Sequence, residues 1–141
     1  MWLPSFLKGK KANTAPLYFY NTLSKSKEAF SLPPYAKAAR MYNCGPTVYG
    51  VQHIGNLSMF VFTDILRRTL EFNAYEVKQV INFTDFGHLT SDADEGDDKM
   101  IKGLKRDGLT PTLDNMREMG KKYAGIFKDD LAKLNIDVSK I

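Results

Sequence analysis

The chain has 141 residues, with 20 Lys and Arg against 16 Asp and Glu, so its formal net charge is +4. Hydrophobic residues make up 43% and aromatic residues 12%, which is enough apolar material for one packed core and excludes a disordered tail. The single cysteine excludes a disulfide framework and a cysteine-rich metal site within the chain, and no apolar run is long enough to span a membrane.

Residues 1–16 are interpreted as an N-terminal extension. The short apolar stretch Met1–Leu7 is followed by Lys8, Lys10 and Lys11, which reverses the order of charge and apolar region in a secretory signal. A transit peptide is the alternative, since the stretch has no acidic residue, although it also lacks arginine. We expect this extension to be poorly ordered and the folded domain to span residues 17–141.

The next elements predict an α/β arrangement. In chain order they are strands over 17–20, 28–30 and 38–43, a helix over 57–72 and a strand over 75–83. The last three form a βαβ unit, in which the two strands run parallel. On the helix, residues at spacings of three and four predict a buried face of Leu57, Phe60, Val61, Ile65, Leu66 and Leu70. The same spacing predicts a solvent face of Ser58, Asp64, Arg67, Arg68 and Glu71, and Asn73 is expected to end the helix.

Two further helices are predicted after a polar loop over 84–98. That loop ends in an acidic run, Asp92–Asp98, whose glycine falls one position too early for a calcium-binding EF-hand loop. The first helix covers 99–106. The second is expected to be capped by Thr110, with Pro111 at its first position and a buried apolar face from Leu113 to Leu134.

The segment between the third strand and the long helix is the most informative for chemistry. Parallel sheets bind ligands where strands end and helices begin, and a helix N-terminus favours phosphate. His53 and Asn56 lie at this junction and are able to donate hydrogen bonds to a phosphate. An ordinary loop with a surface histidine explains the same pattern equally well.

Cys44 allows two interpretations at the end of its strand. As a thiolate in a ligand cleft it is a candidate Zn²⁺ ligand. However, His53 and His88 are the only histidines, and neither stands at a conventional metal spacing from Cys44. Spacing alone therefore favours a structural cysteine.

The sequence of this region nevertheless resembles one family. Cys44-Gly45-Pro46-Thr47-Val48-Tyr49, followed by His53-Ile54-Gly55-Asn56, closely resembles the opening of the class I cysteinyl-tRNA synthetases. The last four residues correspond to the class I signature His-Ile-Gly-His. Collinear matches extend from about Leu17 to Val138: Tyr20-Asn21-Thr22-Leu23, Asp64-Ile65-Leu66-Arg67-Arg68, Asn82-Phe83-Thr84-Asp85, residues 87–94 and Asp98-Lys99-Met100.

The resemblance implies a Rossmann-like (HUP-type) catalytic domain, a parallel sheet with flanking helices, of which residues 17–141 are the first half only. It implies that Cys44 is the first ligand of a Zn²⁺ that recognises the substrate thiol, with the other ligands beyond residue 141. The implied ATP contacts are Thr47, His53, Gly55 and Asn56, with His53 and Asn56 catalytic. The implied cysteine and adenylate pocket consists of Cys44, Gly45, Asn82 and Thr84.

The implied reaction has two steps. The carboxylate of L-cysteine attacks the α-phosphorus of ATP, accompanied by Mg²⁺, and pyrophosphate leaves. The cysteinyl group then passes to a hydroxyl of the terminal adenosine of tRNA(Cys). The resemblance implies a cytoplasmic and monomeric parent protein that does not interact with membranes.

The sequence departs from the family pattern at three places. Asn56 replaces the second signature histidine, Ser58-Met59 stands where many members carry Arg-Thr, and the second class I signature, Lys-Met-Ser-Lys-Ser, is absent. We therefore expect an incomplete domain that is inactive in isolation. Two alternatives are the cysteine ligase of mycothiol synthesis, which uses an amino-sugar acceptor, and a truncated nucleotide-binding module without activity. Tyr49, Gly50 and residues 87–94 fit the synthetase better than the ligase.

Overall fold

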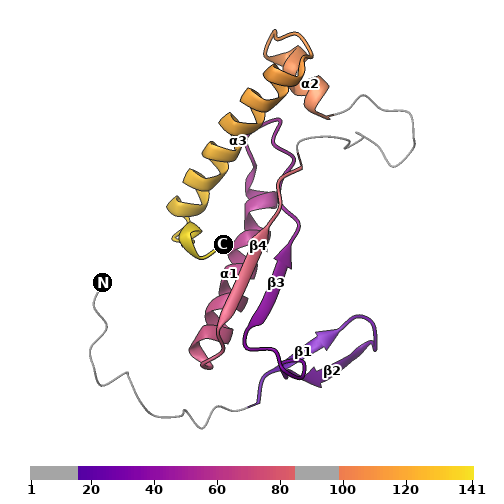
Figure 1. Ribbon diagram of the computed structural model, residues 1–141, viewed down its shortest axis with the longest axis vertical. Coiled ribbons are helices and arrows are strands. Elements are labelled where there is room, and N and C mark those ends of the chain that lie inside the picture. Colours follow the sequence, from indigo (N-terminus) through magenta and orange to yellow (C-terminus); the bar gives the residue numbers. More distant parts are fainter. Residues whose placement is uncertain (1–15, 85–98) are drawn as a thin grey trace.

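The computed structural model describes residues 16–84 and 99–141, which form strands, helices and a short 3-10 turn (Figure 1). In chain order the elements are β1 (Tyr18–Asn21), β2 (Ser26–Ala29), β3 (Ala39–Asn43), α1 (Ile54–Phe72), β4 (Val77–Ile81), α2 (Lys99–Arg106), α3 (Leu113–Lys133) and η2 (Val138–Lys140). The predicted N-terminal extension and the predicted acidic loop lie outside the described residues, apart from Pro16 and Thr84.

β1 and β2 pair as an antiparallel hairpin and confirm the first two predicted strands. The second strand begins two residues earlier than predicted, at Ser26. After the hairpin, Phe30 meets the rings of Phe19 and Tyr75 edge to face, with centroids 5.3 and 5.2 Å apart. These aromatic contacts attach the hairpin to the segment that leads into β4.

β3, α1 and β4 form the predicted βαβ unit. β3 and β4 are parallel neighbours, with Ala39 opposite Val77 and Asn43 opposite Ile81. Figure 1 shows α1 lying along the two strands. Because parallel strands end at the same edge of a sheet, the segments that follow β3 and β4 leave the sheet side by side.

α1 begins three residues earlier than predicted, at Ile54, because His53 caps it. The His53 side chain accepts a hydrogen bond from the backbone N–H of Gly55, one of the donors that a helix N-terminus leaves without an intrahelical partner. At the other end, Asn73 is the C-cap, as predicted, and its backbone N–H donates to carbonyl oxygens of the last turn.

The expectation that Asp64 and Arg67 face solvent is wrong. Their side chains are 9% and 3% exposed and form a salt bridge with each other. Arg67 also pairs with Glu71 at 3.2 Å, and Arg68 pairs with Asp64 at 2.6 Å. Conversely, Ile65 is 56% exposed although its spacing predicts burial. Charged residues are buried where they find partners, and apolar periodicity does not detect such partners.

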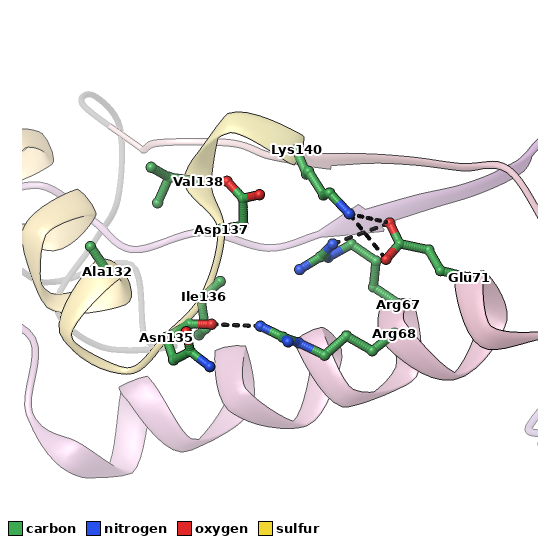
Figure 2. A pocket seen from close by; sticks show the side chains of 9 residues that line it. All are labelled: Arg67, Arg68, Glu71, Ala132, Asn135, Ile136, Asp137, Val138 and Lys140. Atoms are coloured by element: carbon green, nitrogen blue, oxygen red, sulfur yellow. Dashed lines mark hydrogen bonds and ion pairs between the residues drawn. The ribbon is translucent and has the colours of Figure 1, made fainter. Parts of the chain in front are cut away.

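The segment after α3 covers this side of α1 (Figure 2). Arg68 donates a hydrogen bond to the backbone carbonyl of Asn135 at 2.5 Å, and Lys140 pairs with Glu71 at 3.2 Å. These contacts hold residues 135–140 across the C-terminal half of α1. The chain that returns from α3 therefore removes the Asp64–Arg67 pair from solvent.

α3 differs from the prediction at its start. Its N-cap is Thr112, not Thr110, because the Thr112 hydroxyl accepts a hydrogen bond from the backbone N–H of Asn115 at 3.2 Å. The Asn115 side chain in turn donates to the Thr110 carbonyl at 2.8 Å, which keeps residues 110–112 in a turn outside the helix. Pro111 consequently precedes the cap and is not the first helical residue.

Two clusters of buried side chains form the core. One contains Val48, Met100, Leu104, Met119 and Tyr123, and the other contains Phe60, Phe127, Leu131 and Ile136. The first joins the loop after β3 to α2 and α3, and the second joins α1 to α3. Phe83, just after β4, packs against both. The two ends of the predicted apolar face of α3, Leu113 and Leu134, are 65% and 36% exposed.

Replacing Arg67 by alanine is expected to lower the free energy of unfolding by about 3 kcal/mol, because it leaves part of the buried charge of Asp64 without its partner. Urea denaturation of the chain measures this. The matched control is Lys121→Ala, which removes an i,i+3 partner of Glu118 where both side chains are more than 70% exposed. The control should cost less than about 1 kcal/mol, and equal losses in the two variants would contradict burial of the ion pair.

Candidate functional site

The carboxyl ends of β3 and β4 meet at Gly45 and Asn82. The backbone N–H of Gly45 donates to the Asn82 side-chain oxygen at 2.9 Å. A Cβ atom on Gly45 would lie 1.6 Å from the backbone oxygen of Asn82, so only glycine fits where the two backbones approach. Two residues that the sequence assigns to one pocket are thus brought into direct contact. Cys44 is exposed beside them, with its Sγ 3.8 Å from the Gly45 carbonyl oxygen.

Thr47 and Thr84 extend the contact between the two strands. They form an isolated parallel bridge, in which the Val48 N–H donates to the Thr84 carbonyl and the Thr84 N–H donates to the Pro46 carbonyl, both at 3.1 Å. The Val48 side chain is 3% exposed and belongs to the first core cluster. The loop after β3 is therefore held both by backbone hydrogen bonds and by burial of a side chain.

His53 stands at the junction of that loop and α1. Its Nδ1 accepts from the Gly55 N–H at 3.1 Å, which places the proton of the neutral ring on Nε2. A Cβ on Gly55 would lie 2.9 Å from Cε1 of His53, so a larger residue would push the imidazole off the cap. The exposed imidazole is thus oriented by the helix that it caps.

The N-terminus of α1 is suited to bind an anion. Its first turn contains no acidic residue, so nothing there opposes the positive end of the helix dipole. Asn56 is exposed in this turn, and the Ser58 hydroxyl is turned toward the Gly55 carbonyl at 2.9 Å. The predicted site residues therefore form two groups, one where the strands end and one at the start of the helix.

Cys44 fits a Zn²⁺ site as a single ligand. Its thiol is exposed at a strand end, where thiolate coordination is sterically possible. Within residues 16–84 and 99–141, no three His, Cys, Asp or Glu side chains are grouped so that they could hold a metal ion. The described residues alone therefore do not complete a four-coordinate zinc site.

A third group of residues contacts the loop between β3 and α1, and the sequence gives no signal for this contact. Arg106, the last residue of α2, donates from Nη2 to the backbone carbonyl of Tyr49 at 2.9 Å and to the Tyr123 hydroxyl at 2.8 Å. Its Nε donates to Asp107 at 2.8 Å, and this hydrogen bond holds the pKa of the Asp107 carboxyl below its usual value of 3.8. Arg106 and Tyr49 are far apart in sequence, so only the folded chain shows their contact.

None of the helices in the two described ranges is both long enough and apolar enough to cross a membrane.

The fold and this site define a class of protein. Residues 31–141 match the class I (C) tRNA synthetase catalytic domain, and the chain belongs to this family. Membership confirms the predicted fold class and agrees with the parallel strands and flanking helices of the structure.

Similar curated proteins are cysteine--tRNA ligases. The ligase of Novosphingobium aromaticivorans is 45% identical over 125 residues, which are 89% of this chain and 24% of that protein. Cysteine--tRNA ligase 1 of Burkholderia lata is 48% identical over 121 residues, 86% of this chain and 24% of that protein. The ligase of Zymomonas mobilis is 46% identical over 123 residues, which are 87% of this chain and 23% of that protein. The chain thus spans about a quarter of the length of these relatives.

Gly45→Ala is expected to lower the free energy of unfolding by about 3 kcal/mol, because the added methyl group forces the ends of β3 and β4 apart. Urea denaturation of the chain measures this. The control is Gly125→Ala on α3, where a Cβ meets nothing within 4 Å and where alanine should stabilise the helix by about 1 kcal/mol. A Gly45→Ala chain as stable as the parent would disprove the close approach.

Proposed function

We propose that the protein containing this chain is a cysteine--tRNA ligase, which activates L-cysteine with ATP and transfers the cysteinyl group to tRNA(Cys). The observation that carries the proposal is the place of His53-Ile54-Gly55-Asn56. This tetrapeptide starts α1 beside the ends of two parallel strands, in a chain 45% and 48% identical to two cysteine--tRNA ligases. Residues 17–141 are then the N-terminal part of the catalytic domain.

His53 and Asn56 bind the phosphates of ATP in this proposal. The Nε2–H of His53 and the side-chain amide of Asn56 donate to phosphate oxygens, together with the free N–H groups of the α1 N-terminus. Thr47 and Gly55 line the same part of the ATP site. As the cysteine carboxylate attacks the α-phosphorus and pyrophosphate leaves, these donors stabilise the charge on the phosphoryl oxygens.

Cys44, Gly45, Asn82 and Thr84 form the pocket for cysteine and its adenylate. Gly45 lets the ends of β3 and β4 approach because it has no side chain, and Asn82 is oriented by its hydrogen bond to the Gly45 N–H. Cys44 is one ligand of a Zn²⁺ ion, and the remaining ligands come from outside the described residues. When bound, zinc would favour the thiolate of cysteine over the hydroxyl of serine.

In the second step a hydroxyl of the terminal adenosine of tRNA(Cys) attacks the cysteinyl carbonyl, and AMP leaves. Mg²⁺ accompanies ATP in the first step, as is general for phosphoryl-group chemistry on nucleotides. We place the enzyme in the cytoplasm, where tRNA charging serves translation, and propose that it acts as a monomer.

The full-length protein should catalyse cysteine-dependent exchange of pyrophosphate into ATP and should charge tRNA(Cys), whereas the 141-residue chain alone should do neither. Exchange together with transfer of cysteine to an amino sugar, and not to tRNA, would identify the ligase of mycothiol synthesis instead. Binding of ATP without exchange would identify a non-catalytic nucleotide-binding module.

His53→Asn in the full-length protein separates the two roles of this residue. Asparagine is as good an N-cap, so the unfolding midpoint should stay within about 1 °C of the parent, but the donor at the Nε2 position is lost. The exchange rate should fall by about 100-fold or more. His53→Ala, the comparison variant, should also lose about 1 kcal/mol of stability. An exchange rate within about twofold of the parent in His53→Asn would remove His53 from the phosphate site.

Cys44→Ser in the full-length protein is expected to lower its zinc content and its preference for cysteine over serine, because a hydroxyl is a poor zinc ligand at neutral pH. Metal analysis of the purified protein and exchange rates with both amino acids measure this. The exposed position of Cys44 predicts an unchanged unfolding transition in the variant domain. Unchanged zinc content would remove Cys44 from the metal site.

A further inference from the structure

α2 and α3 are packed against the loop that leads from β3 to His53, and Figure 1 shows α2 beyond the carboxyl ends of the two parallel strands. The contact is close at Gly103, where a Cβ would lie 3.0 Å from the Tyr49 carbonyl oxygen and 3.1 Å from the Tyr49 Cβ. The last residue of α2, Arg106, then reaches the same Tyr49 carbonyl with Nη2 at 2.9 Å. The Arg106 Nη1 would lie 3.3 Å from a Cβ on Gly50.

The Arg106 side chain is held in this position by Asp107, the next residue in the chain, and by Tyr123 on α3. Its guanidinium donates to the Tyr123 hydroxyl and to Asp107, both at 2.8 Å, and the Tyr123 hydroxyl donates to the second Asp107 oxygen at 3.2 Å. Lys122 lies over the Tyr123 ring at 5.1 Å from its centroid. Because Tyr123 is 8% exposed and belongs to the first core cluster, these contacts are anchored in the core.

The loop from β3 to α1 is therefore fixed at three successive points. Asn82 binds Gly45, Thr84 pairs with the segment at Thr47, and Arg106 binds Tyr49. The first two points come from the segment just after β4, whereas the third comes from the end of α2. Of the three anchored residues, Tyr49, which Arg106 holds, is nearest in sequence to His53, and its anchor is separate from the one beside Cys44.

We propose that Arg106 is a positioning residue for His53: its hydrogen bond to the Tyr49 carbonyl fixes the segment Tyr49–His53, and through it the imidazole that faces the ATP phosphates. The expected effect on the binding of ATP rests on the proposed function. The fixing of the segment Tyr49–His53 rests on the observed contacts alone. The proposed role predicts that loss of Arg106 affects the ATP site and leaves the cysteine site, which Asn82 holds, nearly unchanged.

The test compares Arg106→Ala with Lys102→Ala in the full-length protein. Lys102 is an exposed cation of the same helix, and its replacement controls for a general loss of positive charge. Arg106→Ala should raise the KM for ATP about tenfold and leave the KM for cysteine within about twofold. Lys102→Ala should change neither by more than about twofold, and Arg106→Lys, which keeps one donor, should give an intermediate KM for ATP.

A purely structural role would lower kcat through loss of folded protein without separating the two KM values. An equal rise of both KM values, an unchanged KM for ATP, or an equal effect of Lys102→Ala would overturn the proposal. If Arg106→Ala does not fold, Tyr123→Phe removes one partner of Arg106 while keeping the packed ring, and should raise the KM for ATP about threefold. An unchanged KM for ATP in that variant would likewise overturn it.

Amide hydrogen exchange on the same variants separates this inference from the proposed function. In Arg106→Ala, the amide of Gly55, bound to His53 Nδ1, should exchange about tenfold faster, while the Gly45 amide, bound to Asn82, should keep its rate. A parent protein without pyrophosphate exchange would disprove the proposed function and leave this measurement valid. An unchanged exchange rate at the Gly55 amide would overturn the role of Arg106 whatever the activity.

Discussion

β3 and β4 run parallel over five residue pairs, and their carboxyl ends are locked together where Gly45 meets Asn82. Everything proposed for the site depends on this approach of two backbones. It sets Cys44 beside Asn82, and the following bridge between Thr47 and Thr84 directs the chain toward α1. A methyl group on Gly45 would overlap the Asn82 carbonyl, so the arrangement requires a residue without a side chain.

Around this pair of strands, the remaining elements act as supports. α1 supplies the helix N-terminus at which His53 stands. Its far end is covered by residues 135–140, through the hydrogen bond of Arg68 to the Asn135 carbonyl and the ion pair of Lys140 with Glu71. α2 and α3 pack on the loop between β3 and α1, and Val48 of that loop belongs to the same core cluster as their side chains. Phe83 packs against both core clusters, which couples the strand ends to the two long helices.

The two groups of site residues rest on different physical effects. At the strand ends, position comes from backbone hydrogen bonds and from a steric requirement for glycine. At His53, position comes from a side-chain cap, which stabilises the helix and sets the tautomer of the imidazole at the same time. The same side chain thus serves local structure and the proposed binding of phosphate, through different nitrogens.

The features of this protein that the sequence predicts are those set by residues close together in the chain. Apolar spacing located α1 and α3, other local sequence features located α2 and the strands of the βαβ unit, and the residues around Cys44 and His53 identified the family that the match over residues 31–141 confirmed. Spacing could not show that Asp64 and Arg67 are buried, because their burial depends on residues 135–140 folding back across α1. The sequence pattern also misplaced the cap of α3, because Thr112 binds the backbone N–H of Asn115 while the Asn115 side chain binds Thr110.

The sequence by itself therefore determined the order of the elements and the parallel βαβ unit, and it predicted the residues of the candidate site, because periodicity and motifs are properties of neighbouring residues. Only the tertiary structure decided which of these residues touch and what holds them. The contact of Gly45 with Asn82, the buried ion pair and the reach of Arg106 to Tyr49 join residues distant in the chain. Such contacts are set by packing in three dimensions, which leaves no regular spacing in the sequence.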